Sequence, residues 1–386
     1  MFLRKTIEQN SALIEYAFQA LNDGLIMPDT YLIDLDAILN NAQLFVEAAK
    51  AKGLHSYFML KQLGRNPEIA RRLAKIGFDG AVCVDFFETM TYLKHGIKLG
   101  NVGHLVQLPH HVIEMVLPAQ PEIVTVFSYE NARAISQAAG KLGFRQDIML
   151  KVSGKGNATY DGQQGGFQLE DLEKLALKIL GLPNVRINGV CSFPCFLYDD
   201  NTRQIEATAN TKSVRMVAEI LRQLGCQIDQ LNMASANCLA SLDLAVAEGA
   251  THVEPGHALS GTTPYHALEN VHDEQPAIVY VSEISHNYDR HAFCYGGGYY
   301  RRGHLAEALV GKSLDSAKRL GVNPPNAENI DYYLELAEPC EIFDPVIMAF
   351  RTQLFVTRSR VGLVEGLSTG KPVLNSLYTS LGEKVN

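Results

Sequence analysis

The sequence lacks the features that direct a chain to a membrane, to nucleic acid or into a disulfide framework. None of its 386 residues lies in an apolar run approaching the roughly 18 residues of a membrane span. The formal net charge is −8, whereas sequence-independent nucleic-acid binding needs a basic surface. Seven cysteines are present, an odd number, and no two of them form a Cys-x-x-Cys pair. We therefore expect no membrane partner, no nucleic-acid partner and reduced thiols.

Several targeting and catalytic motifs are also missing. The first residues have neither the apolar core nor the small-residue cleavage site of a signal peptide, so we expect a cytoplasmic protein. No phosphate-binding GxxxxGK[ST] loop and no GxSxG nucleophile motif occurs. The histidines include no His-x-x-x-His pair, and His110 and His111 are adjacent, so we expect no metal site.

A regular alternation of short apolar runs and amphipathic stretches occupies most of the chain. Because runs buried on both faces and joined by crossover helices form parallel sheets, eight of them predict a closed (β/α)8 barrel. An open doubly wound sheet is the alternative, but no GxGxxG follows the first run. The eight runs span residues 57–60, 80–84, 102–108, 123–127, 147–152, 187–192, 230–233 and 251–254.

The pattern divides the chain into three parts. Residues 1–28 are predicted to form a helical N-terminal arm, and residues 29–265 the α/β barrel. After residue 265 the alternation stops, and the β-rich segments that follow predict a mostly β C-terminal domain over 266–386. The strand at 30–35 precedes the alternation, so it could belong to either domain.

Two candidate site residues lie at the ends of predicted barrel strands, where functional groups of such barrels gather. Lys61 follows the first run, and partial desolvation there would make its amine a nucleophile. The alternative is a lysine whose charge reaches out to water. Glu254 ends the last run and precedes Pro255-Gly256, so its carboxylate could bind a protonated ring nitrogen while Gly256 approaches an anion. An ordinary loop glutamate is equally compatible with this pattern.

Three further segments are candidates for binding or catalysis. Ser235 and Asn237 stand at the predicted start of a helix, where free amides suit phosphate, although a plain helix cap explains them too. Residues 295–304 combine a run of three consecutive glycines with tyrosines and arginines, as an anion site or a bulged hairpin would. Cys340 lies close to two acidic residues, and a buried structural cysteine is the alternative there.

Taken together, these residues resemble the fold-type III pyridoxal-phosphate enzymes, which include alanine racemase, ornithine and diaminopimelate decarboxylases, and the D-serine dehydratase and D-threonine aldolase branch. Within that group the chain is most similar to YhfX-like proteins with an alanine racemase N-terminal domain. The resemblance covers roughly residues 28–386. It implies an alanine racemase-like barrel, a β C-terminal domain and the cofactor pyridoxal 5′-phosphate.

The resemblance implies specific roles around the cofactor ring. Lys61 stands where the family has the lysine that binds the cofactor covalently. Glu254 and Gly256 match the decarboxylase Glu-Pro-Gly-Arg segment, where the glutamate pairs with the pyridine nitrogen and the glycine faces the phosphate. His257 replaces the phosphate-binding arginine of that segment, and Phe193 stands near a histidine that the family places against the ring.

The resemblance also implies a phosphate segment and a group from a second subunit. Ala236-Asn237 is similar to the phosphate segment of alanine racemase, with Ser235 available because Cys238 replaces the usual serine. The segment containing Cys340 is similar to the decarboxylase segment that enters the partner's site. Its two acids are candidate substrate contacts, and two tyrosines are further candidate acids. These four residues are Glu341, Asp344, Tyr295 and Tyr299.

We expect an enzyme that acts at Cα of an amino acid or related amine, with a racemase or epimerase placed first. A decarboxylase is the main alternative because of Glu254 and Cys340. A non-catalytic carrier of pyridoxal phosphate is a third possibility, since several family residues are replaced. The family further implies a homodimer with shared active sites.

Overall fold

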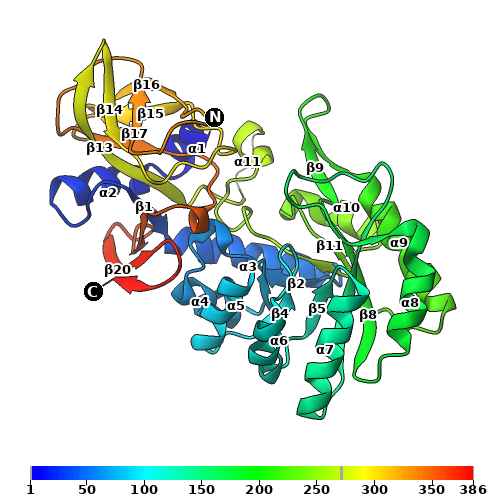
Figure 1. Ribbon diagram of the computed structural model, residues 1–386. Coiled ribbons are helices and arrows are strands. Elements are labelled where there is room, and N and C mark those ends of the chain that lie inside the picture. The colour runs from blue at the N-terminus through cyan, green and yellow to red at the C-terminus, as the bar shows by residue number, and fades with distance from the viewer. Residues whose placement is uncertain (1, 270–272, 386) are drawn as a thin grey trace. The chain divides into compact units, whose positions relative to one another are not determined.

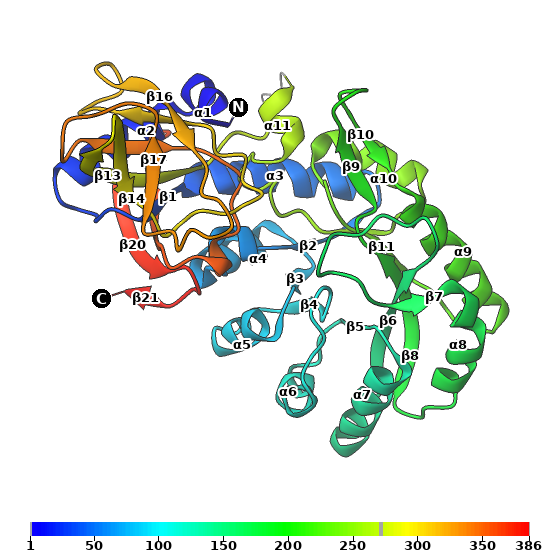
Figure 2. The same ribbon diagram turned by 45° about the horizontal axis from the view of Figure 1, so that its top comes forward.

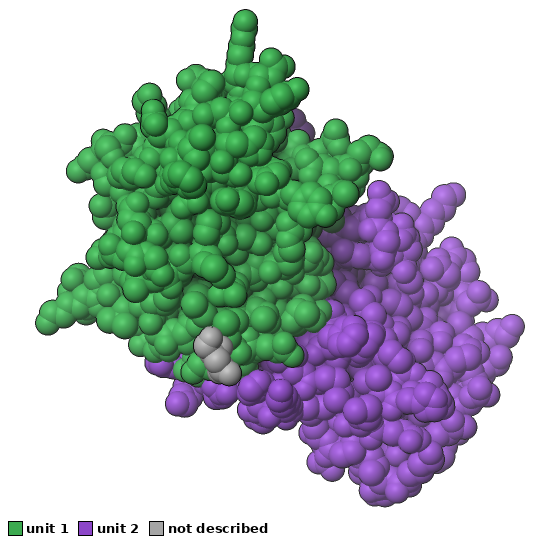
Figure 3. Space-filling view, turned by 60° about the vertical axis from the view of Figure 1, so that its left-hand side comes forward, with its two compact units in different colours: residues 1–44, 60–69, 257–386 green, residues 45–59, 70–256 purple. Residues whose placement is uncertain are grey.

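The computed structural model describes residues 2–269 and 273–385, which form two compact units (Figure 1, Figure 3). Unit 1 comprises residues 1–44, 60–69 and 257–386, and unit 2 comprises residues 45–59 and 70–256. The chain therefore passes between the units several times. Lys61 and His257 belong to unit 1, whereas Glu254 belongs to unit 2.

Unit 2 contains a closed barrel of eight parallel strands, as the sequence predicted (Figure 2). Each strand pairs with the next, and β12 pairs with β2 to close the ring. The strands are β2 (His55–Phe58), β3 (Gly80–Cys83), β4 (Leu99–Val102), β5 (Ile123–Val126), β6 (Gln146–Ser153), β8 (Val185–Ser192), β11 (Gln230–Met233) and β12 (His252–Val253). A short β7 (Phe167–Gln168) extends β6, and β9 (Phe196–Asp199) pairs with β10 (Gln204–Ala207).

Helices connect the barrel strands, and polar caps fix where two of them begin. Asp85 accepts a hydrogen bond from the Glu88 amide, and Ser128 accepts one from the Asn131 amide, so each satisfies a helix-terminal donor. The helices are α3 (Leu35–Ala51), α4 (Pro67–Ile76), α5 (Phe86–Lys94), α6 (His110–Val116), α7 (Tyr129–Leu142), α8 (Leu172–Leu180), α9 (Ala209–Gln223) and α10 (Leu242–Ala247).

The third barrel segment differs most from its predicted boundaries. The apolar run 102–108 predicted a strand there, but β4 covers Leu99–Val102 and the rest of the run is loop. Gln107 stabilises this loop, because its side-chain amide donates to the backbone oxygens of Gly103 and Thr125. A loop whose polar backbone is satisfied in this way can contain apolar residues without joining the sheet.

Unit 1 is built on a mostly antiparallel sheet of ten strands, which confirms the predicted β-rich part of the chain. Six of them close into a ring, because β14 pairs with both β17 and β13. In sheet order the strands are β14 (His291–Tyr295), β17 (Tyr333–Leu336), β16 (Lys318–Asn323), β15 (Glu307–Val310), β18 (Pro345–Met348), β13 (Ile278–Tyr288), β1 (Thr30–Asp34), β19 (Arg360–Glu365), β20 (Val373–Thr379) and β21 (Lys384–Val385). The strand before the barrel, β1, thus lies in this sheet, antiparallel to β13 and parallel to β19.

The N-terminal segment forms two helices that are part of the core of unit 1. Helix α1 (Phe2–Gln9) and helix α2 (Ser11–Asn22) contribute buried side chains such as Leu3, Leu13 and Phe18. These side chains pack in one apolar cluster with residues of β1, β13, β15 and β18. The segment predicted as an arm is therefore an integral layer of the β unit. Among the described residues, no helix is both long and apolar enough to cross a membrane.

Candidate active site

Lys61 begins a short 3-10 turn, η1 (Lys61–Leu63), three residues after β2 ends. Gly64 ends this turn in the left-handed region, with φ of 75°, which a glycine adopts without steric cost. Lys61 is 9% exposed. The next residue is anchored within unit 1, because Thr352 Oγ1 donates to the Gln62 carbonyl oxygen at 3.0 Å. The predicted cofactor lysine is therefore a buried amine on a tightly fixed turn.

Glu254 follows β12 inside unit 2, where the barrel holds its carboxylate in a fixed orientation. Its Oε1 accepts hydrogen bonds from Asn101 Nδ2 at 2.8 Å and from Asn232 Nδ2 at 2.7 Å. Asn101 is itself fixed, because its Oδ1 accepts a hydrogen bond from Thr125 Oγ1 at 2.7 Å. These partners come from β4, β5 and β11, so the parallel strands bring them together at one level of the barrel.

His104 lies next to the second oxygen of Glu254 and was not among the residues singled out from the sequence. Its Nε2 lies 3.6 Å from Glu254 Oε2, and both side chains are fully buried. The sequence carries a signal, because His104 and Gln107 are the two polar side chains in the run 102–108. It was overlooked because that run was assigned to a strand, whereas His104 lies in the loop after β4.

The loop of residues 234–237 has an unusual backbone. Ser235 and Ala236 both have positive φ, 99° and 46°, in a region that residues with side chains rarely adopt. Asn237 braces this loop, because its Oδ1 accepts from the Glu254 amide at 2.9 Å and its Nδ2 donates to the Met233 carbonyl at 3.2 Å. The predicted helix start at Ser235 is wrong, because these φ values exclude a helix. The first helical turn is η4 (Leu239–Ser241).

Aromatic side chains of unit 2 surround the position of Phe193. Its ring meets the His104 ring edge to face at 5.5 Å between centroids, and the Tyr160 ring at 5.7 Å.

A second lysine, Lys151 on β6, is also buried, 3% exposed. Its Nζ stands 4.3 Å from the centroid of Phe127, and burial lowers its pKa. Lys151 is thus the natural comparison for Lys61.

His257 lies in the interior of unit 1 as a hydrogen-bond acceptor. Its Nε2 accepts from Arg351 Nε at 3.0 Å and from Gln353 Nε2 at 3.3 Å, and its Nδ1 pairs with Thr262 Oγ1 at 3.2 Å. Burial, and then the charges of Arg351 and Lys61, hold the pKa of His257 well below its usual value. His257 is therefore neutral at physiological pH, and Arg351 supplies the cation at this place.

The two candidate tyrosines lie in the β unit, which contains a cavity of about 680 Å³. Tyr295 ends β14 and lines the cavity, 37% exposed. The Tyr299 amide donates to Asp331, and burial raises the pKa of the Tyr299 phenol. Asp29 also lines the cavity, and its burial raises the pKa of the carboxyl to about 6. Phenol groups and a carboxyl of this kind are suited to proton transfer.

Cys340 lies between β17 and β18 of the same unit. Its backbone is fixed by Asn287, whose side chain accepts from the Cys340 amide at 3.0 Å and donates to its carbonyl at 2.8 Å. Burial, and then the charge of Asp344, raises the pKa of the Cys340 thiol, so it stays protonated. Asp344 pairs with Lys312 at 2.8 Å, and Glu341 is exposed.

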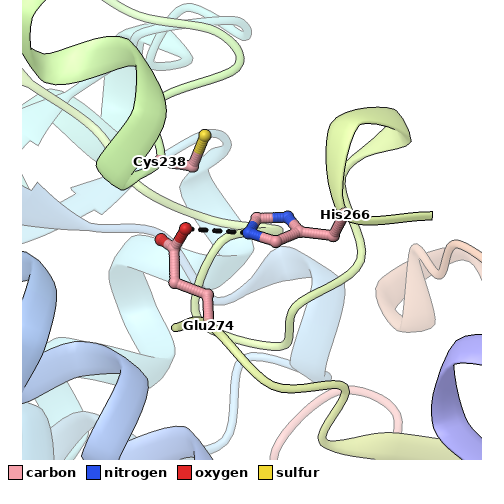
Figure 4. Close-up of side chains that lie close together, drawn as sticks. All are labelled: Cys238, His266 and Glu274. Carbon is pink, nitrogen blue, oxygen red and sulfur yellow. Dashed lines mark hydrogen bonds and ion pairs between the residues drawn. The ribbon is translucent and has the colours of Figure 1, made fainter. Parts of the chain in front are cut away.

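A buried histidine–carboxylate pair lies near the short helix α11 (Pro264–Leu268). His266 Nε2 donates to Glu274 Oε2 at 2.8 Å, as Figure 4 shows, and its Nδ1 pairs with Thr263 Oγ1 at 2.6 Å. Because Thr263 also caps α11, the pair fixes the start of this helix to the chain that follows. We assign it a structural role in unit 1.

Comparison with known proteins places this geometry in a family. Residues 33–264 match the alanine racemase N-terminal domain, and residues 279–374 match the YhfX-like C-terminal domain. The chain belongs to the alanine racemase N-terminal domain family. This confirms the resemblance drawn from the sequence. Pyridoxal 5′-phosphate is the cofactor of this family, as predicted.

Two relatives are similar to this chain in sequence, and two solved structures are similar to it in fold. The uncharacterized protein YhfX of Escherichia coli K12 is 38% identical over the full length of both chains. A pyridoxal phosphate homeostasis protein of Pseudomonas aeruginosa is 31% identical over 121 residues, 31% of this chain and 46% of that protein. D-threonine aldolase from Filomicrobium marinum shares the fold, with TM-score 0.69, 16% identity and coverage of 92% of this chain and 95% of that one. Alanine racemase from Clostridium difficile 630 gives TM-score 0.62 at 16% identity, covering 91% and 98%.

The residues of the chain fit this cofactor chemically. Within unit 1, Lys61 is a buried amine and Arg351 a cation, which are the groups that an aldehyde and a phosphate would require. Within unit 2, Glu254 is a fixed carboxylate, the group that a protonated ring nitrogen would require. Among the buried polar atoms that have no hydrogen-bond partner within the described part of the chain are Gln353 Oε1 in unit 1 and Asn232 Oδ1 in unit 2. Since buried polar groups are normally satisfied, such atoms are typical of places that receive a ligand or water.

Proposed function

We propose that the chain is a pyridoxal-phosphate-dependent enzyme acting at Cα of an amino acid, and that it racemises or epimerises its substrate. One observation chiefly supports an enzyme that acts at Cα, whichever reaction it catalyses there: the carboxylate of Glu254 is fixed by Asn101 and Asn232. The similarity to the alanine racemase N-terminal domain is the reason for placing racemisation first. Pyridoxal phosphate, when bound, supplies a ring that withdraws electrons from Cα. A carboxylate at the ring nitrogen keeps that nitrogen protonated, which strengthens the withdrawal.

Most of the predicted site residues have a role in this proposal. Lys61 binds the cofactor and moves a proton at Cα on one face. Tyr295 of the partner copy in a homodimer moves a proton on the opposite face, with Tyr299 as the alternative, because a racemase needs two acid–base groups. Phe193 contacts the ring. The remaining residues contact the phosphate or the substrate: Ser235, Asn237 and Gly256 the phosphate, and Glu341 and Asp344 the substrate.

A decarboxylase is the second candidate, and the state of Cys340 favours it. Because the pKa of its thiol is raised, Cys340 can donate a proton at neutral pH. A decarboxylase needs only this one proton donor at Cα after carbon dioxide leaves.

A carrier of pyridoxal phosphate is the third candidate, supported by the match to a homeostasis protein. That match covers 31% of this chain, whereas the chain has in addition a complete β unit bearing Tyr295 and Cys340. The fixed Glu254 also serves no purpose in simple storage, so these features support an enzyme.

Lysine substitution tests the cofactor assignment. We expect the wild-type protein to develop the visible absorbance band of lysine-bound pyridoxal phosphate and Lys61→Ala to lack it. The matched control is Lys151→Met, which removes the other buried barrel lysine and should keep the band. A colourless wild type, or a band that survives in Lys61→Ala, would contradict the proposal.

Deuterium incorporation separates the three reactions. Incubation with each enantiomer of a panel of amino acids in deuterated water should give the opposite enantiomer with deuterium at Cα. Tyr295→Phe should retain exchange of one enantiomer without interconversion, whereas a control on the barrel helix α7, Tyr129→Phe, should behave as wild type. Carbon dioxide release without interconversion would identify a decarboxylase, and a bound cofactor with no turnover would identify a carrier.

A further inference from the structure

A cationic cluster in unit 1 surrounds the buried His257. Because Nε2 of His257 accepts hydrogen bonds from Arg351 Nε and Gln353 Nε2, the proton of the neutral ring lies on Nδ1, facing Thr262. Thr262 is fixed in turn by Ser260, whose Oγ lies 2.8 Å from Thr262 Oγ1. Both ring nitrogens of His257 therefore have hydrogen-bond partners within the protein. Because the ring is neutral, it cannot supply a positive charge to a bound anion.

The bond to His257 fixes the orientation of the Arg351 guanidinium. It uses Nε, one of five N–H donors, and the terminal N–H groups are those that bind an oxyanion in a bidentate manner. The backbone of this residue is also fixed, because the Arg351 amide donates to the Gly303 carbonyl at 2.9 Å. Because Arg351 is held both at its backbone amide and at Nε, its guanidinium is preorganised to bind an oxyanion.

Arg351 is connected to the turn that bears Lys61. The adjacent Thr352 donates to the Gln62 carbonyl, and the charge of Lys61 acts on the same His257 ring as the charge of Arg351. Two cations thus lie close to one neutral acceptor. A phosphate monoester carries about −1.5 to −2 charges at pH 7, so it matches two cations better than a carboxylate does.

We propose that Arg351 binds the phosphate of pyridoxal phosphate and that neutral His257 positions it. The proposal rests on the cofactor and lysine of the proposed function. It makes Arg351 the source of the positive charge that His257 does not provide, although the two positions are 94 residues apart in the sequence.

The test compares pyridoxal phosphate with pyridoxal, which has the same aldehyde but no phosphate. Dissociation constants for both are measured from the absorbance band of wild type, Arg351→Met, Arg351→Lys and the exposed control Arg319→Met. We expect Arg351→Met to weaken pyridoxal phosphate about ten- to a hundredfold, the value of a charge-assisted hydrogen bond, and to leave pyridoxal unchanged. Arg351→Lys should keep part of the preference for pyridoxal phosphate over pyridoxal, and the control Arg319→Met should keep all of it.

A second measurement uses inorganic phosphate as the probe. With pyridoxal bound, inorganic phosphate should strengthen its binding in wild type and have no such effect in Arg351→Met. Where the Met variant does not fold, Arg351→Lys reports the same discrimination.

Three outcomes would overturn this inference. Equal weakening of pyridoxal and pyridoxal phosphate would mean that Arg351 only supports the fold. Unchanged binding of both, with a raised KM for the amino acid, would assign Arg351 to the substrate carboxylate. If wild type gives a band with neither compound, the proposed function itself fails, and this result does not depend on any Arg351 variant.

Discussion

At the scale of single residues, buried polar groups depend on neighbours that come from other parts of the chain. Glu254 is oriented by Asn101 and Asn232, and His257 by Arg351 and Gln353. Each of these bonds joins positions far apart in sequence. A buried polar group without such partners would be costly, so these contacts decide which chemistry the group can perform.

His252 gives a prediction about pH. It lies on β12, stacked on His55 at 4.8 Å, and burial lowers its pKa to about 3. The unfolded chain binds a proton at this residue below about pH 6.5, whereas the folded chain does so only near pH 3. Stability is therefore lost as the pH falls from about 6.5 towards 3.

We expect His252→Phe to reduce this loss. Between pH 7 and pH 4 the free energy of unfolding should fall by roughly 3 kcal/mol less in the variant than in wild type, measured by urea unfolding. The exposed His110→Phe is the control and should keep the wild-type slope. Identical pH profiles for wild type and His252→Phe would show that His252 does not cause the loss.

At the scale of single residues, the sequence located two candidate residues in the fold, while their roles at a cofactor stay predictions. Lys61 and Glu254 follow barrel strands, and the end of a strand can be located from the apolar pattern. Asn101, His104 and Arg351 could not be found in this way. Their importance comes from contacts across the barrel or within the β unit, and no periodicity encodes such contacts.

At the scale of elements, helix α2 shows how an apparently separate segment stabilises a unit. Its residues Leu13, Ile14 and Phe18 are almost completely buried, against side chains of the β sheet. Asn10 caps the helix by accepting from the Leu13 amide and also donates to Asp34 of β1 at 2.8 Å. The helix is thus tied to the sheet by apolar packing and by polar bonds.

We expect Phe18→Ala to lower the free energy of unfolding by about 3 to 5 kcal/mol, because it leaves a cavity in this core. The neighbouring Gln19 is exposed, so Gln19→Ala should change stability by less than about 0.5 kcal/mol. Denaturant unfolding of both variants provides the measurement. If α2 were only an attached arm, Phe18→Ala would be as mild as Gln19→Ala.

At the scale of the whole molecule, exposed aromatic side chains on the β unit support a homodimer. Tyr288 and Tyr332 are 72% and 65% exposed, and they line one cavity together with Tyr333, His286 and Phe293. Aromatic residues are enriched in protein interfaces, where their burial contributes much of the binding energy. A second copy of the chain is the partner that the proposed shared site requires.

We expect the protein to sediment with twice the mass of the 42.5 kDa chain. The double variant Tyr288→Ser with Tyr332→Ser should shift this equilibrium towards the monomer. Phe87→Ser removes an equally exposed aromatic residue from the barrel unit and serves as the control. A wild type that sediments as a monomer at all concentrations would exclude the shared site and leave the cofactor assignment intact.

The sequence by itself determined the barrel, the β-rich remainder and the lysine and glutamate at its strand ends, because these depend on local periodicity. The tertiary structure decided which neighbours fix those groups and where the positive charge lies. It placed β1 and the N-terminal helices in the β unit, and it made His257 neutral while Arg351 carries the charge. Such features arise from contacts between distant parts of the chain and from burial, and both exist only once the chain has folded.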